Sequence, residues 1–228
     1  MKFNNLDVII IRRKRKTLEL RVFPDKIEVR SPNYVSENSV KNFLELKRAW
    51  IDVQVRKYSQ YGSLLPHNRK YNSGELFLYL GKKYELRVID SFENKVDNDD
   101  ENIYVYSKNT DKKIISKMLF VWYNKNAFEI IRKRIDYLKN YFSIKPSSIQ
   151  IKDLKSCWGR CYSNGKIIFN WKIIMSDIKI LDYVIIHEFS HLFHMNHGKE
   201  FWNLVKNVCP DYKIRRQWLK NYGFLLSI

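Results

Sequence analysis

Apolar and polar residues alternate along four segments in the first half of the chain, as is typical of β-strands with one buried face. These segments are residues 17–22, 26–30, 75–80 and 84–89. A turn-forming pair separates the members of each couple, Pro24-Asp25 in the first and Gly81-Lys82 in the second. The pattern therefore predicts two pairs of neighbouring strands, and a further short strand is expected at residues 103–106.

A helical pattern lies between the two strand pairs. Apolar residues recur every three or four positions over residues 36–58, which predicts one helix that begins at Ser36 or Ser39. Residues 93–102 are polar and acidic, and we expect them to form a solvated loop.

The second half of the chain is mostly helical in pattern. A long amphipathic helix is expected over residues 111–142. Short strands are expected at 149–151 and 167–170, and further helices at about 176–196, 199–208 and 211–221. The fold class is therefore predicted to be α+β, with a β-rich N-terminal region over residues 1–109 and a second domain over residues 110–228.

Composition indicates the size of the core and the compartment in which the protein is expected. The chain has 228 residues, of which 45% are hydrophobic, enough for a sizeable core. No apolar run approaches the length of about 20 residues that spans a bilayer. The N-terminus lacks the order of a signal peptide, and three cysteines do not indicate a disulfide framework. We therefore expect a cytoplasmic protein without membrane association.

The net charge of +18 is large for a chain of this size. Such a charge favours acidic partners, nucleic acid above all. The basic run at residues 12–16 is the best candidate surface, although it is also consistent with a solvated strand end. A lysine-rich coding bias is the simpler explanation of the charge as a whole.

The segment His187-Glu188-Phe189-Ser190-His191 is an H-E-x-x-H motif. Two histidines four residues apart lie on one helix face and can bind one metal ion, while the glutamate beside them can act as a base on bound water. The flanking residues are apolar, and burying such polar groups is costly unless they have partners. The motif predicts a metal centre; the alternative is a pair of hydrogen-bonded core histidines.

A catalytic zinc site needs a third protein ligand. His194 follows His187 by seven residues, about 10.5 Å along a helix axis, and is too far away for bonds of about 2.0–2.1 Å. The third ligand must therefore follow a turn, and His197 fits because Asn196 and Gly198 favour a helix end. The remaining candidates are Asp211, Glu200 and His194.

The spacing of ten residues between His187 and His197 is also that of the metzincin pattern. Position 194 is His instead of Gly, and no Met follows residue 195 to form a Met-turn. These departures argue against a metzincin.

Residues 187–202 resemble the zinc-binding segment of the YgjP-type zinc-dependent metallopeptidases, minigluzincin-like proteins related to the SprT group. Further motifs of this family occur in the same order: residues 15–22, residues 78–88, Trp158-Gly159-Arg160-Cys161 and Asn170-Trp171. The resemblance covers nearly the whole chain. It departs locally at Cys157, where the family usually has Arg, and at Arg160, where it usually has a small residue.

The resemblance implies a peptidase with a small zincin-like core. His187, His191 and His197 would bind one zinc ion per chain, and Glu188 would be the general base that activates water for attack on a peptide bond. SprT relatives act on protein attached to DNA, so the alternative is a nucleic-acid-associated protein whose zinc site is accessory or acts only on DNA-bound protein. A structural zinc module is a third interpretation, which Glu188 disfavours.

Several further roles are left open by the sequence. The oxyanion of the transition state needs a donor besides zinc, and the downstream candidates are Tyr212, Arg215, Arg216 and Tyr222. Strand 166–170 is expected to pair with an extended substrate, as edge strands do in zinc peptidases. A second metal site that uses Cys157, Cys161 and Cys209 is the alternative to three free thiols, and His67 is expected in a loop.

Overall fold

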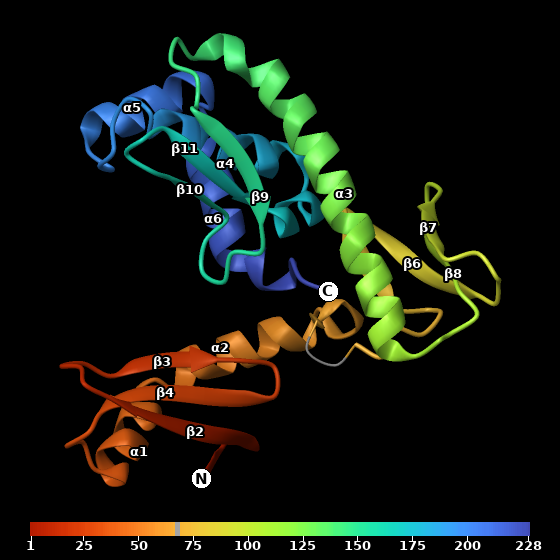
Figure 1. Cartoon of the computed structure of the whole chain (residues 1–228). Helices are drawn as coiled ribbons and strands as arrows, with labels where there is room; N and C mark the ends of the chain where they lie inside the picture. The colour runs from red at the N-terminus through yellow and green to blue at the C-terminus, as the bar shows by residue number, and fades with distance from the viewer. Residues whose placement is uncertain (67–68) are drawn as a thin grey trace. The chain divides into compact units, whose positions relative to one another are not determined.

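The computed structural model describes residues 1–66 and 69–228, so the loop position expected for His67 lies outside the described residues. The chain forms two compact units, Met1–Asn68 and Arg69–Ile228 (Figure 1). Small sheets and helices alternate through both units, which confirms the predicted α+β class.

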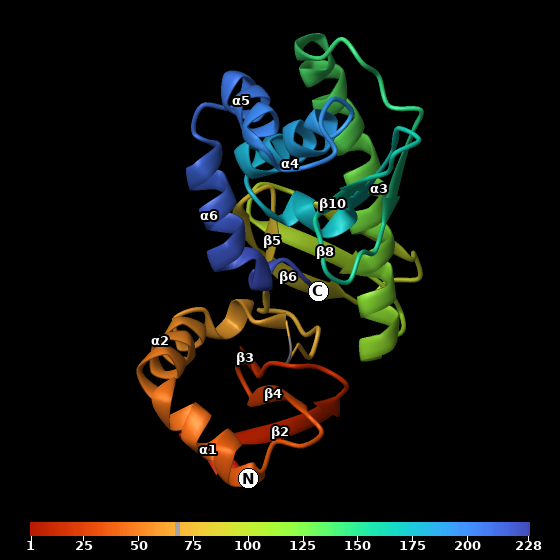
Figure 2. The same cartoon turned by 90° about the vertical axis from the view of Figure 1, so that its left-hand side faces the viewer.

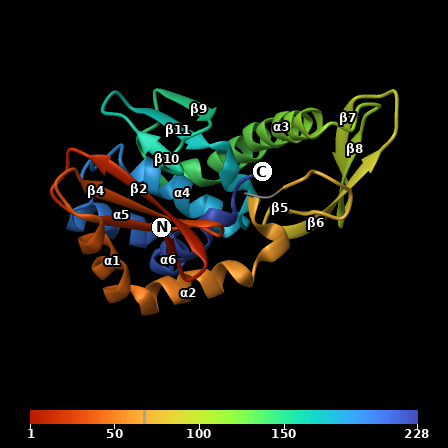
Figure 3. The same cartoon turned by 90° about the horizontal axis from the view of Figure 1, so that it is seen from below.

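Unit 1 is a four-stranded sheet covered by two helices. Its strands are β1 (Lys2–Phe3), β2 (Leu6–Arg13), β3 (Glu19–Val22) and β4 (Lys26–Pro32), in the order β1-β2-β4-β3 with β2 and β4 parallel. The helices α1 (Glu37–Leu46) and α2 (Arg48–Ser59) lie along one side of this sheet (Figure 3). Ile27 of β4 and Leu44 of α1 are fully buried in the core between them.

The single helix expected over residues 36–58 is thus two helices. Ser36 caps the first as predicted, because its hydroxyl accepts a hydrogen bond from the Ser39 N–H at 3.1 Å. The break is at Lys47, whose φ of −102° and ψ of 6° are not helical. A short 3₁₀ helix, η1 (Gly62–Leu64), follows α2.

Part of the basic run at residues 12–16 is used inside unit 1. The Arg12 guanidinium donates to the carbonyls of Pro32 and Val35, and Arg15 pairs with Glu19 at 2.9 Å. Four cations of the run are exposed: Arg12, Arg13, Lys14 and Lys16. A nucleic-acid surface at this place stays a prediction.

Unit 2 contains two further sheets. The first has β5 (Leu76–Tyr79), β6 (Lys82–Ile89), β7 (Lys95–Asn98) and β8 (Asn102–Tyr106) in the order β5-β6-β8-β7. The second has β9 (Ser148–Lys152), β10 (Gly159–Cys161) and β11 (Lys166–Asn170) in the order β10-β11-β9. Residues 93–102 were expected to form a solvated loop, but they contain the strand β7. This strand forms because β7 pairs with β8 and Val96 packs on the core.

The helices of unit 2 pack around these sheets (Figure 2). They are α3 (Lys112–Leu138), α4 (Ile178–Ser190), α5 (Lys199–Val208) and α6 (Tyr212–Tyr222), with 3₁₀ turns η3 (Lys139–Tyr141), η4 (Trp171–Met175) and η5 (Gly223–Leu225). The first sheet shares one core with α3, since Phe77, Leu86 and Leu119 are all fully buried in it. The chain therefore divides into compact units between residues 68 and 69, whereas the sequence pattern placed the border after residue 109.

The hairpin between β5 and β6 fixes the start of α4. The Leu80 and Gly81 N–H groups donate to the carbonyls of Ile174 and Met175, at 2.8 and 3.2 Å. Gly81 has a φ of +81°, and a Cβ there would lie 2.9 Å from the Cα of Asp177, the N-cap of α4. Only glycine fits this turn, both by its conformation and by its closeness to the helix.

An ion pair fixes the middle of α4 against α3. The guanidinium of Arg134 donates to both oxygens of Asp182, at 2.7 and 2.8 Å. Asp182 is 9% exposed, so its carboxylate depends on this bidentate partner.

We expect Arg134→Leu to lower the free energy of unfolding by about 2–3 kcal/mol, because it leaves the Asp182 carboxylate buried and unpaired. The control is Arg87→Leu, which removes an exposed 3.2 Å pair with Glu85 and is expected to cost less than about 1 kcal/mol. Urea titration followed by tryptophan fluorescence measures both, since five of the six tryptophans lie in unit 2. Equal losses in the two variants would contradict the role of the Arg134–Asp182 pair.

Candidate metal centre

The C-terminal end of α4 determines where the histidines lie. The residues from Ile180 to Ile186 are all buried, and the helix ends at Ser190, before the end expected near residue 196. The Ser190 carbonyl then accepts the N–H groups of Phe193 and His194, at 3.2 and 3.1 Å. The chain turns there and leads through His197 into α5.

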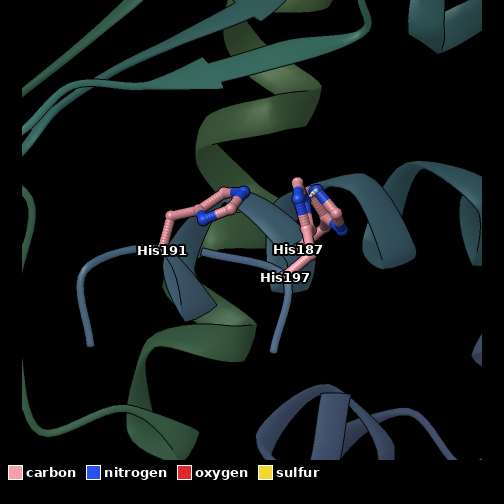
Figure 4. A group of neighbouring side chains, drawn as sticks. All are labelled: His187, His191 and His197. Carbon is pink, nitrogen blue, oxygen red and sulfur yellow. Dashed lines mark hydrogen bonds between the residues drawn. The ribbon is translucent and has the colours of Figure 1, made fainter. Parts of the chain in front are cut away.

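Three imidazoles meet at this turn (Figure 4). His187 comes from the last turn of α4, His191 caps the helix, and His197 precedes α5. Their candidate ligand atoms lie within 4.8 Å of one another, and no other group of this kind occurs in residues 1–66 and 69–228. The other candidates for third ligand, Asp211, Glu200 and His194, are outside the group.

The donor set fits a divalent metal. The Nε2 atoms of His187 and His197 are 3.1 Å apart. Two nitrogens bound to one tetrahedral ion, each at about 2.0–2.1 Å, would be about 3.3 Å apart. The structure thus holds this pair close to the separation that a shared ion requires.

The histidines are also in the protonation state that a metal needs. Burial and the neighbouring imidazoles and Arg216 lower the pKa of His187 to about 3. Burial also lowers the pKa of His191 and of His197. All three rings are therefore neutral near pH 7 and can each offer a lone pair.

A hydrogen bond orients the His191 ring. Its Nδ1 lies 3.1 Å from the His194 carbonyl oxygen, so Nδ1 carries the proton and Nε2 is left for the metal. His194 thus contributes through its backbone, while its exposed side chain does not join the group.

Phe201 of α5 forms the floor beneath the three rings. Its ring centroid lies 5.0, 4.5 and 4.7 Å from those of His187, His191 and His197, and it is fully buried. Trp202 stacks on His197 at 5.6 Å. Phe201 was not among the residues expected at the site, although its position four residues after His197 puts it on the first turn of the next helix.

Glu188 lies beside the histidines on α4, with its carboxylate against β10. It is 6% exposed, and burial raises its pKa to about 8, against the hydrogen bond from the Cys161 N–H and the attraction of Arg160. A Cβ at Gly159 would lie 2.5 Å from Cγ of Glu188. Glycine at residue 159 therefore makes room for the carboxylate beside the strand.

The histidines and Glu188 open on a cleft of about 560 Å³. Of the four downstream candidates for oxyanion donor, Arg216 lines this cleft. The others are not among its lining residues: Tyr212 stacks on Trp202, Arg215 pairs with Asp211 at 2.9 Å, and Tyr222 packs on Trp218. Tyr183 and Lys220, which were not predicted as site residues, also line the cleft.

The strand expected to pair with substrate is not an edge strand. β11 is paired on both sides, with β10 antiparallel and β9 parallel, so it has no free edge. The edge beside the cleft belongs to β10, a strand that the sequence pattern did not predict because it is only three residues long.

The cysteines form no second metal site within the described part of the chain. Cys157 and Cys161 line the cleft as free thiols, while Cys209 is buried with its Sγ 3.5 Å from an oxygen of Asp211.

Comparison with known proteins identifies the family. The model of the YgjP-like metallopeptidase domain matches residues 16–222, most of the chain. The chain belongs to the YgjP-like metallopeptidase family. It is therefore a peptidase of the kind that uses a divalent metal, and peptide or protein is its class of substrate. The relation to the SprT group is not tested by this match and stays a prediction.

A solved structure also resembles the chain. It is the crystal structure of the metallopeptidase zymogen of Methanocaldococcus jannaschii jannalysin, 23% identical, with 40% of this chain and 93% of that chain covered and a TM-score of 0.29. No curated protein matches the chain. None of the described helices has the length and apolar character that crossing a membrane requires.

We expect His197→Ala to lower zinc affinity by more than about 100-fold. Replacing a residue that only hydrogen-bonds a metal ligand already lowers affinity by about 10- to 100-fold, and the loss of the ligand itself should cost more. Competition with a chromophoric chelator measures it. His194→Ala is the matched control and should keep wild-type affinity, because His194 acts through its carbonyl. Unchanged affinity in His197→Ala would show that the third ligand is another residue.

We expect Gly159→Ala to keep its zinc and to lose about 100-fold in peptidase activity, because the added methyl group displaces Glu188. Zinc content and hydrolysis of denatured casein are the two measurements. Gly62→Ala is the control, since a Cβ there meets open space. Full activity in Gly159→Ala would mean that the position of Glu188 is not critical.

Proposed function

We propose that the protein is a zinc-dependent peptidase in which His187, His191 and His197 hold one zinc ion and Glu188 is the general base. The observation that carries this proposal is the convergence of three neutral imidazoles with a buried carboxylate at one cleft. All of these side chains lie within residues 110–228, the segment expected to form the zincin-like domain.

The donor set favours zinc and a catalytic role. Three nitrogen ligands that leave a fourth position open are typical of catalytic zinc, whereas structural sites are closed by four protein ligands. Zinc bound there would polarise the peptide carbonyl and lower the pKa of water in the site. The imidazoles face an open cleft, which supports access of a substrate.

Glu188 would move the proton. It is the sole carboxylate among the residues that the structure places around the cleft. Its burial raises its affinity for a proton, so it can take one from the attacking water and return it to the leaving amine. The Cys161 N–H holds the carboxylate in place between α4 and β10.

The edge of β10 would bind the substrate backbone. The backbone N–H of Tyr162 donates to the Lys166 carbonyl at 2.9 Å, and the backbone N–H of Asn170 donates to the Trp158 carbonyl at 2.8 Å. The backbone groups of residues 158 and 162 therefore face β11. In an antiparallel pair these directions alternate, so the backbone groups of Gly159 and Cys161 face the other side, where the Cys161 N–H is bonded to Glu188 and the Gly159 groups would meet a substrate. An extended peptide that adds to this edge would run beside Glu188.

We expect Glu188→Gln to retain zinc and to lower the rate of peptide hydrolysis by about 10²- to 10⁴-fold, because the amide cannot take the proton. Glu200→Gln is the matched control, an exposed glutamate on the first turn of α5. Zinc content and casein hydrolysis are measured on both. Wild-type hydrolysis by Glu188→Gln would contradict the proposed mechanism.

A further inference from the structure

The cations on α6 fall into two groups. Arg215 has structural partners, since it pairs with Asp211 at 2.9 Å and donates to the Lys179 carbonyl at 2.9 Å. Arg216 and Lys220 are exposed, line the cleft, and make no ion pair with any residue that the structure describes. They are four residues apart and therefore share one face of the helix.

Arg216 is held in position by an aromatic stack. Its guanidinium lies 4.9 Å from the centroid of the Trp202 ring. Trp202 is itself stacked on Tyr212 at 5.1 Å and on His197 at 5.6 Å. A guanidinium over an aromatic ring can still donate through its N–H groups, and its fork of donors suits bidentate binding of a carboxylate.

The charge around the cleft is strongly one-sided. Three cations line it, Arg160, Arg216 and Lys220, and Glu188 is the sole acid among the described lining residues. A second hollow of about 660 Å³ shares Arg216 and Lys220 and adds Lys213. The two hollows thus share a cationic lining from α6.

We propose that Arg216 and Lys220 form a carboxylate subsite, so that the peptidase selects peptides with a carboxylate close to the bond that is cleaved. This inference rests on the proposed function. The carboxylate has two sources, an acidic side chain or the C-terminus of the peptide. The other role considered for Arg216, stabilisation of the oxyanion, would act on every substrate equally.

The test compares kcat/KM for three peptides of otherwise identical sequence on the zinc-loaded enzyme. The first is an amidated alanine-rich peptide with one Gln, the second replaces Gln by Glu, and the third is the Gln peptide with a free C-terminus. We expect the wild type to prefer at least one carboxylate peptide by about 10- to 100-fold, as a charged hydrogen bond allows. No preference for either carboxylate would overturn the proposal.

Variants then assign the preference to α6. In Arg216→Gln and in Lys220→Gln the ratio between the carboxylate peptide and the Gln peptide should fall towards unity, mainly through KM, and Arg216→Lys should restore part of it. Lys206→Gln removes the same charge from an exposed site on α5 and should keep the wild-type ratio. An equal loss on both peptides in Arg216→Gln would overturn the subsite and indicate the oxyanion role.

The ratio of kcat/KM between the carboxylate peptide and the Gln peptide is measured within each variant. Partial misfolding lowers both values equally and leaves this ratio unchanged. If the wild type hydrolyses no peptide, the proposed function fails while the subsite is still testable. Fluorescence anisotropy of the same labelled peptides with zinc-loaded Glu188→Gln then measures binding. Equal affinity for the carboxylate and Gln peptides would overturn the subsite by itself.

Discussion

The end of α4 at Ser190 is the constraint on which the candidate site depends. A helix that continued to residue 196 would carry His194 and His197 away from His187 along its axis. Because the helix stops, the Ser190 carbonyl can bind the N–H groups of the following turn, and His197 comes back to within 3.1 Å of His187. The turn at Gly81 fixes the start of α4, the pair between Arg134 and Asp182 fixes its middle, and its buried residues anchor the rest of the helix.

The second constraint is the burial of Glu188, which makes no ion pair with a residue that the structure describes. An isolated carboxylate is costly in such a place, and its pKa rises to about 8 as a result. The edge of β10 provides the compensation that the fold allows: a hydrogen bond from the Cys161 N–H and the space left by Gly159. If Glu188 is the general base, as proposed, a pKa near neutral pH suits the proton transfers it would make.

Local chemistry made part of this predictable from the sequence. The spacing of His187 and His191, and the geometric exclusion of His194, selected the same three histidines that the structure brings together. The cap at Ser36 and the turn at Gly81 were also readable, since both depend on residues close in sequence.

Features that depend on long-range packing could not be read in the same way. The three-residue strand β10 has too few positions to show a pattern, and β7 forms from a polar segment because β8 lies beside it. The placement of Phe201 under the histidines and of Arg216 over Trp202 needs the packing of α5 and α6 on α4. The sequence offered four oxyanion candidates, and only this packing separates Arg216 from the other three.

The most direct test of the account is an anomalous difference map, recorded at the zinc edge from crystals of the zinc-loaded protein. The account predicts one peak per chain, about 2.0–2.1 Å from a ring nitrogen of each of His187, His191 and His197. A peak beyond bonding distance of one of these histidines, or one about 2.3 Å from the sulfur of Cys157 or Cys161, would contradict this assignment.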